Sequence, residues 1–261
     1  MKFGIGQPLK RKEDSKFITG NGSYTDDINL ENQFSMYIVR SPYAFANIKN
    51  INFSAAEKKK GVLKIINFNI IEKLKIKPMS PGFVVKNKDG SEMVKTLRNI
   101  LAKKKVRYVG QPILAIIAVD LYTAEEASDL IEIEYDVLQS TTNIKDAIDN
   151  DAPIVRDELS NNICFDWELG EKQNTNTSIN NSDYKIDIKL VNNRLVPNPM
   201  ECRSTIGSYN KKNGEYSLYC SSQGVHSLKR KLADILNENE KNINVYTLDV
   251  GGGFGMKIFN Y

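Results

Sequence analysis

The sequence predicts a mixed α/β fold in which short strands alternate with helices along two successive parts of the chain. Three observations lead to this prediction. A continuous apolar run, PILAIIAV (112–119), is typical of a strand that is buried on both faces. A strictly alternating run, IEIEYDV (131–137), follows it after a short helical pattern. Near the end of the chain, a hairpin, a helix and a strand lead into a glycine-rich run at 251–255.

The first half contains further strands and one capped helix. FSMYIVRSP (34–42) and GVLKIINF (61–68) are expected to be strands, and Pro42 ends the first of them. A helix is expected to begin at Thr123, because Thr123 and Glu126 have the spacing of a capping box. The strand, helix and strand within 109–138 then predict a small βαβ element, with a right-handed crossover if its strands are parallel.

A polar segment separates this half from the next strand pattern. Residues 168–183 are almost free of apolar side chains, which is typical of an exposed loop or linker. YKIDIKLV (184–191) alternates immediately afterwards and is expected to be a strand. The boundary between the two parts is therefore placed slightly earlier, near Asp151 to Asp157.

The last third predicts a hairpin, a helix and a strand in that order. Asn213 and Gly214 mark the hairpin turn between STIGSY and EYSLYCSS, and the following helix is expected over about 225–237. NINVYTLDV (242–250) is expected to be the strand that leads to the glycines. Gln223 and the glycine loop would then both lie just beyond the C-terminal ends of strands, where open α/β sheets generally bind ligands.

Composition excludes several classes of function. The 261 residues carry a net charge of only +4, with acidic and basic side chains interspersed, so the pattern does not indicate nucleic-acid binding. Three separated cysteines and one histidine argue against a disulfide framework and against a metal held by protein ligands from this chain. The N-terminus does not have the pattern of a secretory signal, and no apolar stretch has the length of a membrane span, so a cytoplasmic location is expected.

The glycine loop, DVGGGFGMK (249–257), fits neither common nucleotide motif. A P-loop needs a hydroxyl residue after its lysine, but Ile258 follows Lys257. A dinucleotide loop that starts at Gly251 would need a glycine where Met256 stands. Two interpretations remain: a tight turn at a strand end, or a row of backbone amides that closes on an anionic or planar ligand beside Phe254.

Six segments in order resemble one family. They are RKEDSKFITGNGSYTDDI (11–28), RSPYAFANI (40–48), VGQPILAIIAVDLYTAEEASDLIEIEYDVL (109–138), NPMECR (198–203), SSQGVH (221–226) and the glycine loop. Together they resemble the large, molybdopterin-binding subunit of the molybdenum hydroxylases, the family of xanthine dehydrogenase, aldehyde oxidase and aerobic carbon monoxide dehydrogenase. The resemblance covers essentially the whole chain.

The resemblance implies an N-terminal arm (1–17), an α/β hammerhead domain (18–150) and the incomplete first part of a molybdopterin-binding domain (155–261). It also implies a cofactor site. The family glutamine that Gln223 matches lies near an oxo ligand of molybdenum, and the loop that includes Gly252, Gly253, Phe254 and Gly255 wraps the cofactor. The metal is held by the dithiolene of the pterin, in agreement with the lack of protein ligands, and the molybdopterin cytosine dinucleotide form is expected.

Other residues receive structural roles. Glu201 and Arg203 match a family MEPR stretch in which Cys202 replaces the proline, and an ion pair or a backbone-positioning role is expected for them. Trp167, together with Cys164 and Cys220, is expected to lie in the core.

The resemblance assigns no catalytic residue to this chain. In the family, a glutamate base and a substrate-selecting loop lie several hundred residues further on than Tyr261, so the sequence is expected to be an N-terminal piece. Its implied partners are the remainder of the large subunit, an iron–sulfur small subunit and an FAD medium subunit. The substrate stays open among carbon monoxide, aldehydes, purines and other N-heterocycles, with the carbon monoxide dehydrogenase-like branch favoured. The alternative is a catalytically inactive binding or assembly module.

Overall fold

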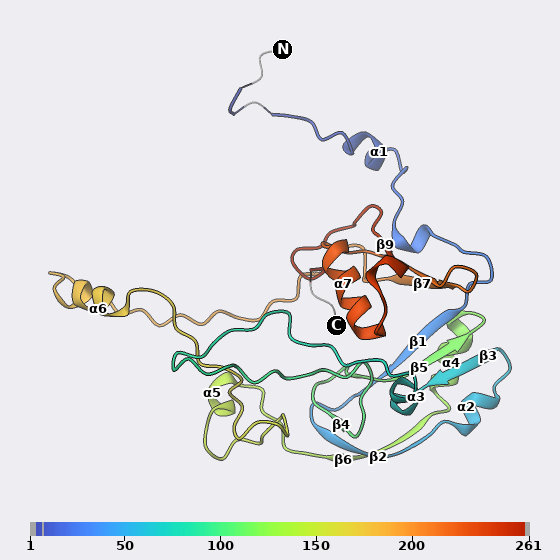
Figure 1. The fold of residues 1–261 in the computed structure, drawn as a ribbon, viewed down its shortest axis with the longest axis horizontal. Coiled ribbons are helices and arrows are strands. Elements are labelled where there is room, and N and C mark those ends of the chain that lie inside the picture. Colours follow the sequence, from blue (N-terminus) through green and yellow to red (C-terminus); the bar gives the residue numbers. More distant parts are fainter. Residues whose placement is uncertain (1–3, 7, 259–261) are drawn as a thin grey trace. The chain divides into compact units, whose positions relative to one another are not determined.

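The computed structural model describes residues 4–6 and 8–258, and the chain divides into two compact units (Figure 1). Unit 1 comprises Met1–Glu31, Val196–Asp234 and Glu238–Tyr261, and unit 2 comprises Asn32–Leu195 and Ile235–Asn237. Strands and helices occur in both units, so the predicted mixed α/β class is confirmed. The domain bounds given above stay a prediction.

Unit 2 contains two antiparallel sheets, with strand orders β1-β5-β3 and β4-β2-β6. Its elements are β1 (Ser35–Arg40), β2 (Ala46–Asn52), α2 (Ser54–Lys58), β3 (Val62–Ile66), α3 (Phe68–Lys73), β4 (Lys105–Val106), β5 (Pro112–Ala118), α4 (Leu121–Ser128), β6 (Glu132–Val137), α5 (Ile144–Ala147) and α6 (Lys172–Asn180).

The core of unit 2 is built around β5. This strand lies between β1 and β3, and the side chains of Ile113, Leu114 and Ile116 have no exposed surface. They form one cluster with residues of the second sheet and of α2 and α4. The prediction of a strand buried on both faces is confirmed, although its neighbours are antiparallel rather than parallel.

Two predictions for this region are wrong. Strands β5 and β6 belong to different sheets, because β6 pairs with β2, so the βαβ element over 109–138 does not form. Helix α4 begins at Leu121, two residues before the predicted start. Its N-cap is Asp120, whose side chain accepts the Thr123 N–H at 2.7 Å. Aspartate is among the best N-cap residues, and it satisfies the first turn without the predicted capping box.

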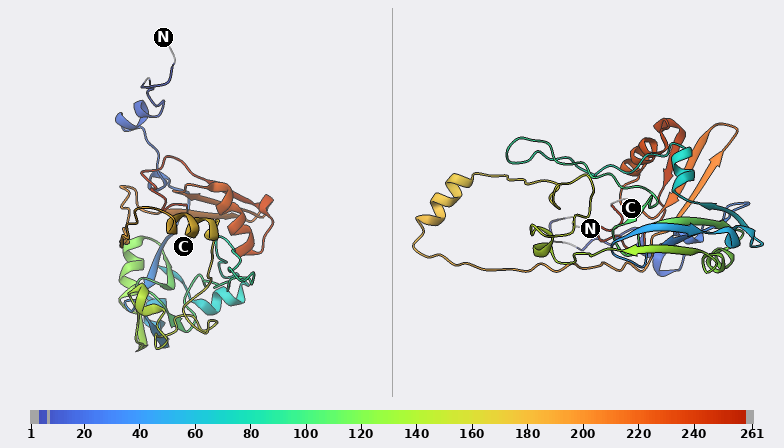
Figure 2. Two further views of the ribbon diagram at one scale, coloured as in Figure 1. Left: turned by 90° about the vertical axis from the view of Figure 1, so that its left-hand side faces the viewer. Right: turned by 90° about the horizontal axis from the view of Figure 1, so that it is seen from below.

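The segment after β6 differs most from its prediction. Every residue from 165 to 196 is exposed, and the segment with helix α6 extends away from the sheets of unit 2 in Figure 1 and in the right-hand view of Figure 2. Residues 168–183 include helix α6, which buries no side chain, and the strand predicted at 184–191 does not form. Trp167 is 53% exposed, so its predicted place in the core is wrong. Cys164 is half-buried and Cys220 is buried.

Unit 1 contains a three-stranded sheet in the order β7-β8-β9. Its elements are α1 (Asp14–Ile18), the 3-10 turn η1 (Thr25–Asp27), β7 (Thr205–Asn210), β8 (Glu215–Cys220), α7 (Val225–Leu236) up to Asp234, the 3-10 turn η2 (Glu240–Asn242) and β9 (Ile243–Tyr246). β7 and β8 form the predicted hairpin, and the predicted helix is α7. β9 runs parallel to β8 and ends four residues before the predicted end at Val250.

Candidate cofactor-binding site

The segment that follows β8 and the segment that follows β9 meet at one edge of the unit 1 sheet. Because β8 and β9 are parallel neighbours, the residues that follow them lie at the same edge. Gln223 and the glycine loop are in direct contact there. The N–H groups of Gly255 and Lys257 donate to Gln223 Oε1 at 3.0 and 3.2 Å, and the Gln223 N–H donates to the Lys257 carbonyl at 3.0 Å. The prediction that Gln223 and this loop follow two strand ends is confirmed.

These bonds determine the orientation of the Gln223 side-chain amide. Two N–H donors point at one of its terminal atoms, so that atom is the oxygen and the other is the NH₂ group. Within the described part of the chain, this NH₂ group donates to no acceptor. Gln223 is also exposed. The loop therefore presents the amide as a fixed hydrogen-bond donor at the surface of unit 1.

The glycines are required where other groups come close. A Cβ at Gly251 would collide with Cβ of Glu201, and a Cβ at Gly253 would lie 2.6 Å from both Cδ and Oε1 of Gln223. Gly252 has φ +99°, in the left-handed region that favours glycine. The turn interpretation of the loop is thus correct for the backbone, but it does not account for the loop's hydrogen-bond donors.

The tip of the loop carries backbone donors that the protein does not use. No acceptor among residues 4–6 and 8–258 takes the N–H of Gly252, Gly253 or Phe254. The side chain of Phe254 is 72% exposed, and its φ is +48°. Successive N–H groups in such a turn form a concavity suited to an anion or a polarised oxygen. Gly255 does not share this property, because its N–H already binds Gln223.

A buried ion pair lies behind the loop. Lys257 Nζ is 2.8 Å from Glu201 Oε2 and donates to the Glu201 carbonyl at 3.0 Å. The two side chains are only 1% and 9% exposed. The same carboxylate oxygen accepts the Ser221 hydroxyl at 2.5 Å and the Gly251 N–H at 2.8 Å. Glu201 thus forms an ion pair with Lys257, a residue that the expectation for Glu201 and Arg203 did not name.

Sequence reasoning missed the importance of Lys257. The residue was considered only as a failed P-loop lysine, yet it is the most buried charged residue of the site. Arg203, the cation nearest to Glu201 in sequence, is exposed. The one available sequence signal was a lysine that directly follows the glycines and Met256 in a turn. Because a lysine is almost never fully buried without a partner, burial of Lys257 would have implied a nearby acidic residue.

The contacts of Glu201 shift its pKa. Burial by itself raises the pKa of the carboxyl, but the bonds from Lys257, Ser221 and Gly251 outweigh burial and hold the pKa below its usual value. The carboxylate is therefore charged at neutral pH. One of its oxygens, Oε1, is buried and has no hydrogen-bond partner in the described structure.

Asp249, at the start of the loop, ties this region to the N-terminal arm. Its carboxylate accepts the Ser23 N–H at 2.8 Å and pairs with Lys16 Nζ at 2.5 Å, and its own N–H donates to the Ser23 carbonyl at 3.0 Å. The Lys16 contact, followed by the Ser23 bond, lowers the pKa of Asp249. The loop is thus anchored on both sides, by Asp249 before the glycines and by Lys257 after them.

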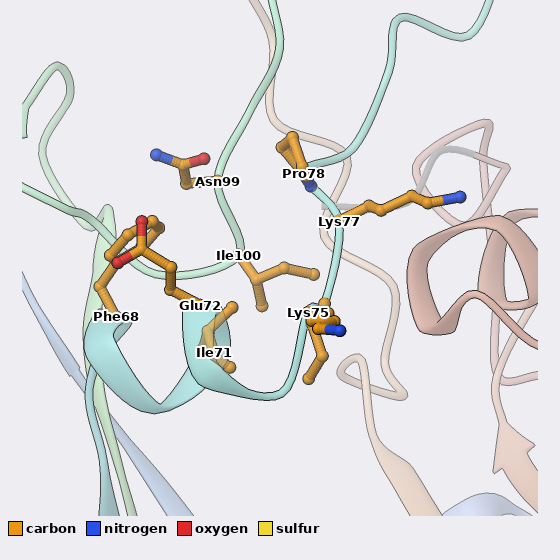
Figure 3. A pocket seen from close by; sticks show the side chains of 9 residues that line it. Phe68, Ile71, Glu72, Lys75, Lys77, Pro78, Asn99 and Ile100 are labelled. Atoms are coloured by element: carbon orange, nitrogen blue, oxygen red, sulfur yellow. The ribbon is translucent and has the colours of Figure 1, made fainter.

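Metal-binding clusters, membrane-spanning helices and pockets in the described residues would each bear on function. Across the described residues, no cluster of three or more histidines, cysteines or acidic residues could hold a metal ion. No helix in that part of the chain combines the length and apolar character needed to cross a membrane. A pocket in unit 2 is lined mainly by α3 and by residues 75–78 and 99–100. Its Ile71 and Ile100 side chains point toward each other (Figure 3), and it shares no residue with the glycine loop.

Comparison with known protein families identifies both parts of the chain. Residues 19–139 match the model of the aldehyde oxidase and xanthine dehydrogenase a/b hammerhead domain, and residues 155–261 match that of the molybdopterin cofactor-binding domain. The chain belongs to the aldehyde oxidase and xanthine dehydrogenase family. The second match includes Gln223 and the glycine loop.

Several of the curated relatives are large subunits. The chain is 28% identical to the carbon monoxide dehydrogenase large chain of Afipia carboxidovorans, over 99% of this chain and 32% of the relative. It is 29% identical to the nicotine 6-hydroxylase large subunit of Paenarthrobacter nicotinovorans, over 97% of this chain and 30% of the relative. This member of the aldehyde oxidase and xanthine dehydrogenase family thus spans about a third of the length of the curated relatives it matches.

Solved structures agree with this assignment. A Cu,Mo-CO dehydrogenase superposes with a TM-score of 0.84 at 27% identity, over 99% of this chain and 33% of that chain. Quinoline 2-oxidoreductase from Pseudomonas putida 86 superposes with a TM-score of 0.82 at 27% identity, over 98% of this chain and 32% of that chain. The predicted hammerhead fold, followed by the start of a molybdopterin-binding domain, is confirmed.

Proposed function

We propose that this chain forms one wall of the molybdopterin site in the large subunit of a molybdenum hydroxylase. One observation carries the proposal. Four hydrogen-bond donors lie together at one edge of the unit 1 sheet and bind no acceptor among the described residues. They are the NH₂ group of Gln223 and the backbone N–H groups of Gly252, Gly253 and Phe254.

The donor set fits a molybdenum–pterin cofactor. Such a cofactor offers oxygen and phosphate acceptors, and its metal is held by the pterin dithiolene, so it needs hydrogen-bond donors and a close backbone rather than metal-ligating side chains. The site provides neutral donors, and the glycines let the loop backbone lie close to Glu201 and Gln223, where a Cβ on Gly251 or Gly253 would collide. Gln223, Gly252, Gly253 and Phe254 would contact the cofactor, while Gly255 would hold the Gln223 amide in place.

When bound, the cofactor supplies the two-electron chemistry of molybdenum with oxygen derived from water. This chain would bind and orient the group, and Phe254 would exclude water from one side of it. The molybdopterin cytosine dinucleotide form is the one we propose. Electrons would leave through an iron–sulfur subunit and an FAD subunit, and the catalytic base would come from the part of a large subunit that this chain does not span.

The substrate is proposed only as a class, a small carbon compound such as carbon monoxide, an aldehyde or an N-heterocycle. We favour the carbon monoxide dehydrogenase-like branch on the sequences QPLKRKEDSKFITGNGSYTDDI (7–28) and GGGFGMK (251–257). A cytoplasmic location is proposed with it.

The test is cofactor retention by the protein isolated from a host that makes molybdopterin cytosine dinucleotide. The chain is produced alone, and also together with the region of the carbon monoxide dehydrogenase large chain that follows its match. Molybdenum is measured by mass spectrometry and pterin by the fluorescence of its oxidised form. We expect near-stoichiometric cofactor in the co-produced complex and loss of most of it with Gln223→Leu. The matched control Gln173→Leu, on the exposed helix α6, should retain it.

A complex that forms but holds no molybdenum in the wild-type form would contradict the proposal. It would favour the alternative, a binding or assembly module without redox chemistry.

A further inference from the structure

The buried Glu201–Lys257 pair occupies a position that no cofactor contact explains. Its atoms lie behind the loop, where Lys257 has only 3% of its surface exposed, whereas the unused donors are at the tip. Burying two opposite charges is costly, and replacement by apolar groups is often neutral or stabilising. Stabilising the fold is therefore not a sufficient reason for a buried ion pair behind the loop.

The hydrogen bonds of the pair indicate what that role is. Glu201 Oε2 accepts from Lys257 Nζ, from the Gly251 N–H and from the Ser221 hydroxyl. One oxygen therefore connects the first glycine of the loop, the last residue of the loop and the residue that follows β8. The Glu201 N–H also donates to the Gly251 carbonyl at 3.2 Å. The distance between the two ends of the loop is thus set by a single carboxylate.

The same loop end controls Gln223. Lys257 uses its side chain to bind Glu201 and its backbone N–H and carbonyl to bind the side chain and main chain of Gln223. A shift of Lys257 would therefore remove one of the two donors that orient the Gln223 amide. The other donor, Gly255, is two residues away on the same turn.

We propose that Glu201 and Lys257 are positioning residues that hold the glycine loop and the Gln223 amide in their binding geometry before any cofactor arrives. Neither residue needs to touch the cofactor. This inference rests on the proposed function for its purpose, but its structural content concerns the chain without cofactor, and it can fail independently.

The first experiment measures amide hydrogen exchange, by NMR or mass spectrometry, in the cofactor-free chain. The amides of interest are those of Gly251, Gly255 and Lys257, whose hydrogen bonds define the loop. In Lys257→Met we expect these amides to exchange at least about tenfold faster, while amides of β8 change much less, because local opening needs less free energy than global unfolding. Lys88→Met is the matched control, since it removes an exposed ion pair of 2.6 Å and should leave loop exchange unchanged.

A second variant separates positioning from plain stability. The double variant Glu201→Gln/Lys257→Met has no uncompensated buried charge, so its thermal stability should recover most of what either single variant loses. If the pair positions the loop, exchange at the Gly255 and Lys257 amides stays fast in the double variant. A merely structural pair would instead show recovery of both properties together.

Three results would overturn the inference: wild-type loop exchange in a folded Lys257→Met protein, restored loop protection in the double variant, or failure of the double variant to fold, which would make the pair a stability element of unit 1. Cofactor retention gives the separate readout. If the wild-type complex binds no molybdenum but loop exchange changes as expected, the proposed function fails and the positioning role stands.

Discussion

The segment 184–191 and the glycine loop 249–257 differ in how well their sequence patterns match their structures. The first has the alternating pattern of a strand, yet it is fully exposed and has no regular structure. The second has no periodic pattern, yet its backbone and side chains are joined by hydrogen bonds to Glu201, Ser221 and Gln223. An alternating sequence shows that a segment can pair as a strand if a neighbouring strand is present. Whether a segment has a defined structure in the folded chain depends on the contacts that it makes there.

The largest expected effect comes from comparing an apolar side chain in a packed strand with one in the exposed segment. Leu190 is 85% exposed in the unstructured segment, and Leu114 has no exposed surface in β5. Leu114→Ala should lower the free energy of unfolding by about 2–5 kcal/mol, through lost burial and the cavity left behind. Leu190→Ala, the matched control, should change it by less than about 0.5 kcal/mol. Chemical denaturation measures both. Comparable losses would mean that the exposed segment packs against something in solution.

The next largest effect is expected in the glycine loop. Gly253→Ala places a Cβ 2.6 Å from Gln223 Cδ and Oε1, so either the loop or the glutamine must move. We expect a loss of about 1–3 kcal/mol in the free energy of unfolding, as for other overpacked sites. Exchange at the Gly255 amide should also become faster.

The control for this variant is Gly207→Ala in β7. A Cβ at Gly207 has no atom within 4 Å, so the alanine should be tolerated. Equal stability of the Gly253→Ala and Gly207→Ala proteins would show that the loop is not packed as described.

The smallest effect concerns pH. Because the folded-state pKa of Glu201 lies below its usual value of 4.5, the unfolded chain takes up a proton more readily at this group. Its contribution to stability is therefore present above about pH 4.5 and is lost as pH falls through the lower folded-state pKa. The stability difference between the wild-type protein and Glu201→Gln should be constant near neutral pH and shrink in acid. Urea unfolding at several pH values measures it, and a difference that stays unchanged in acid would contradict the ion-pair geometry.

Local signals were sufficient for much of the fold. The buried run of β5, the Asn213-Gly214 hairpin and helix α7 follow from patterns confined to a few neighbouring residues, and each is where it was predicted. Predictions failed where pairing over long distances decided the outcome. The alternating run 131–137 is a strand, but nothing local shows that it pairs with β2 instead of following β5 into one sheet.

The candidate site was predictable only in part. Gln223 and the glycines were found because strand ends of parallel neighbours meet at one edge. The Glu201–Lys257 pair was not, because its residues are 56 positions apart and the burial that gives Lys257 its meaning is a tertiary property. Likewise, only the structure shows that the Gly255 N–H donates to Gln223 Oε1. It also shows that the N–H groups of Gly252, Gly253 and Phe254 bind no acceptor among the described residues.

The bond between Ser23 and Asp249 joins residues 226 positions apart. The ribosome must therefore make the long stretch of chain between these two residues before this contact can exist, whereas the β7–β8 hairpin needs only neighbouring residues. Contacts between such distant positions form late, because the entropy of closing the intervening chain must first be overcome. The start of the glycine loop is thus among the last parts of unit 1 to become ordered during synthesis, after the sheet on which it rests has begun to form.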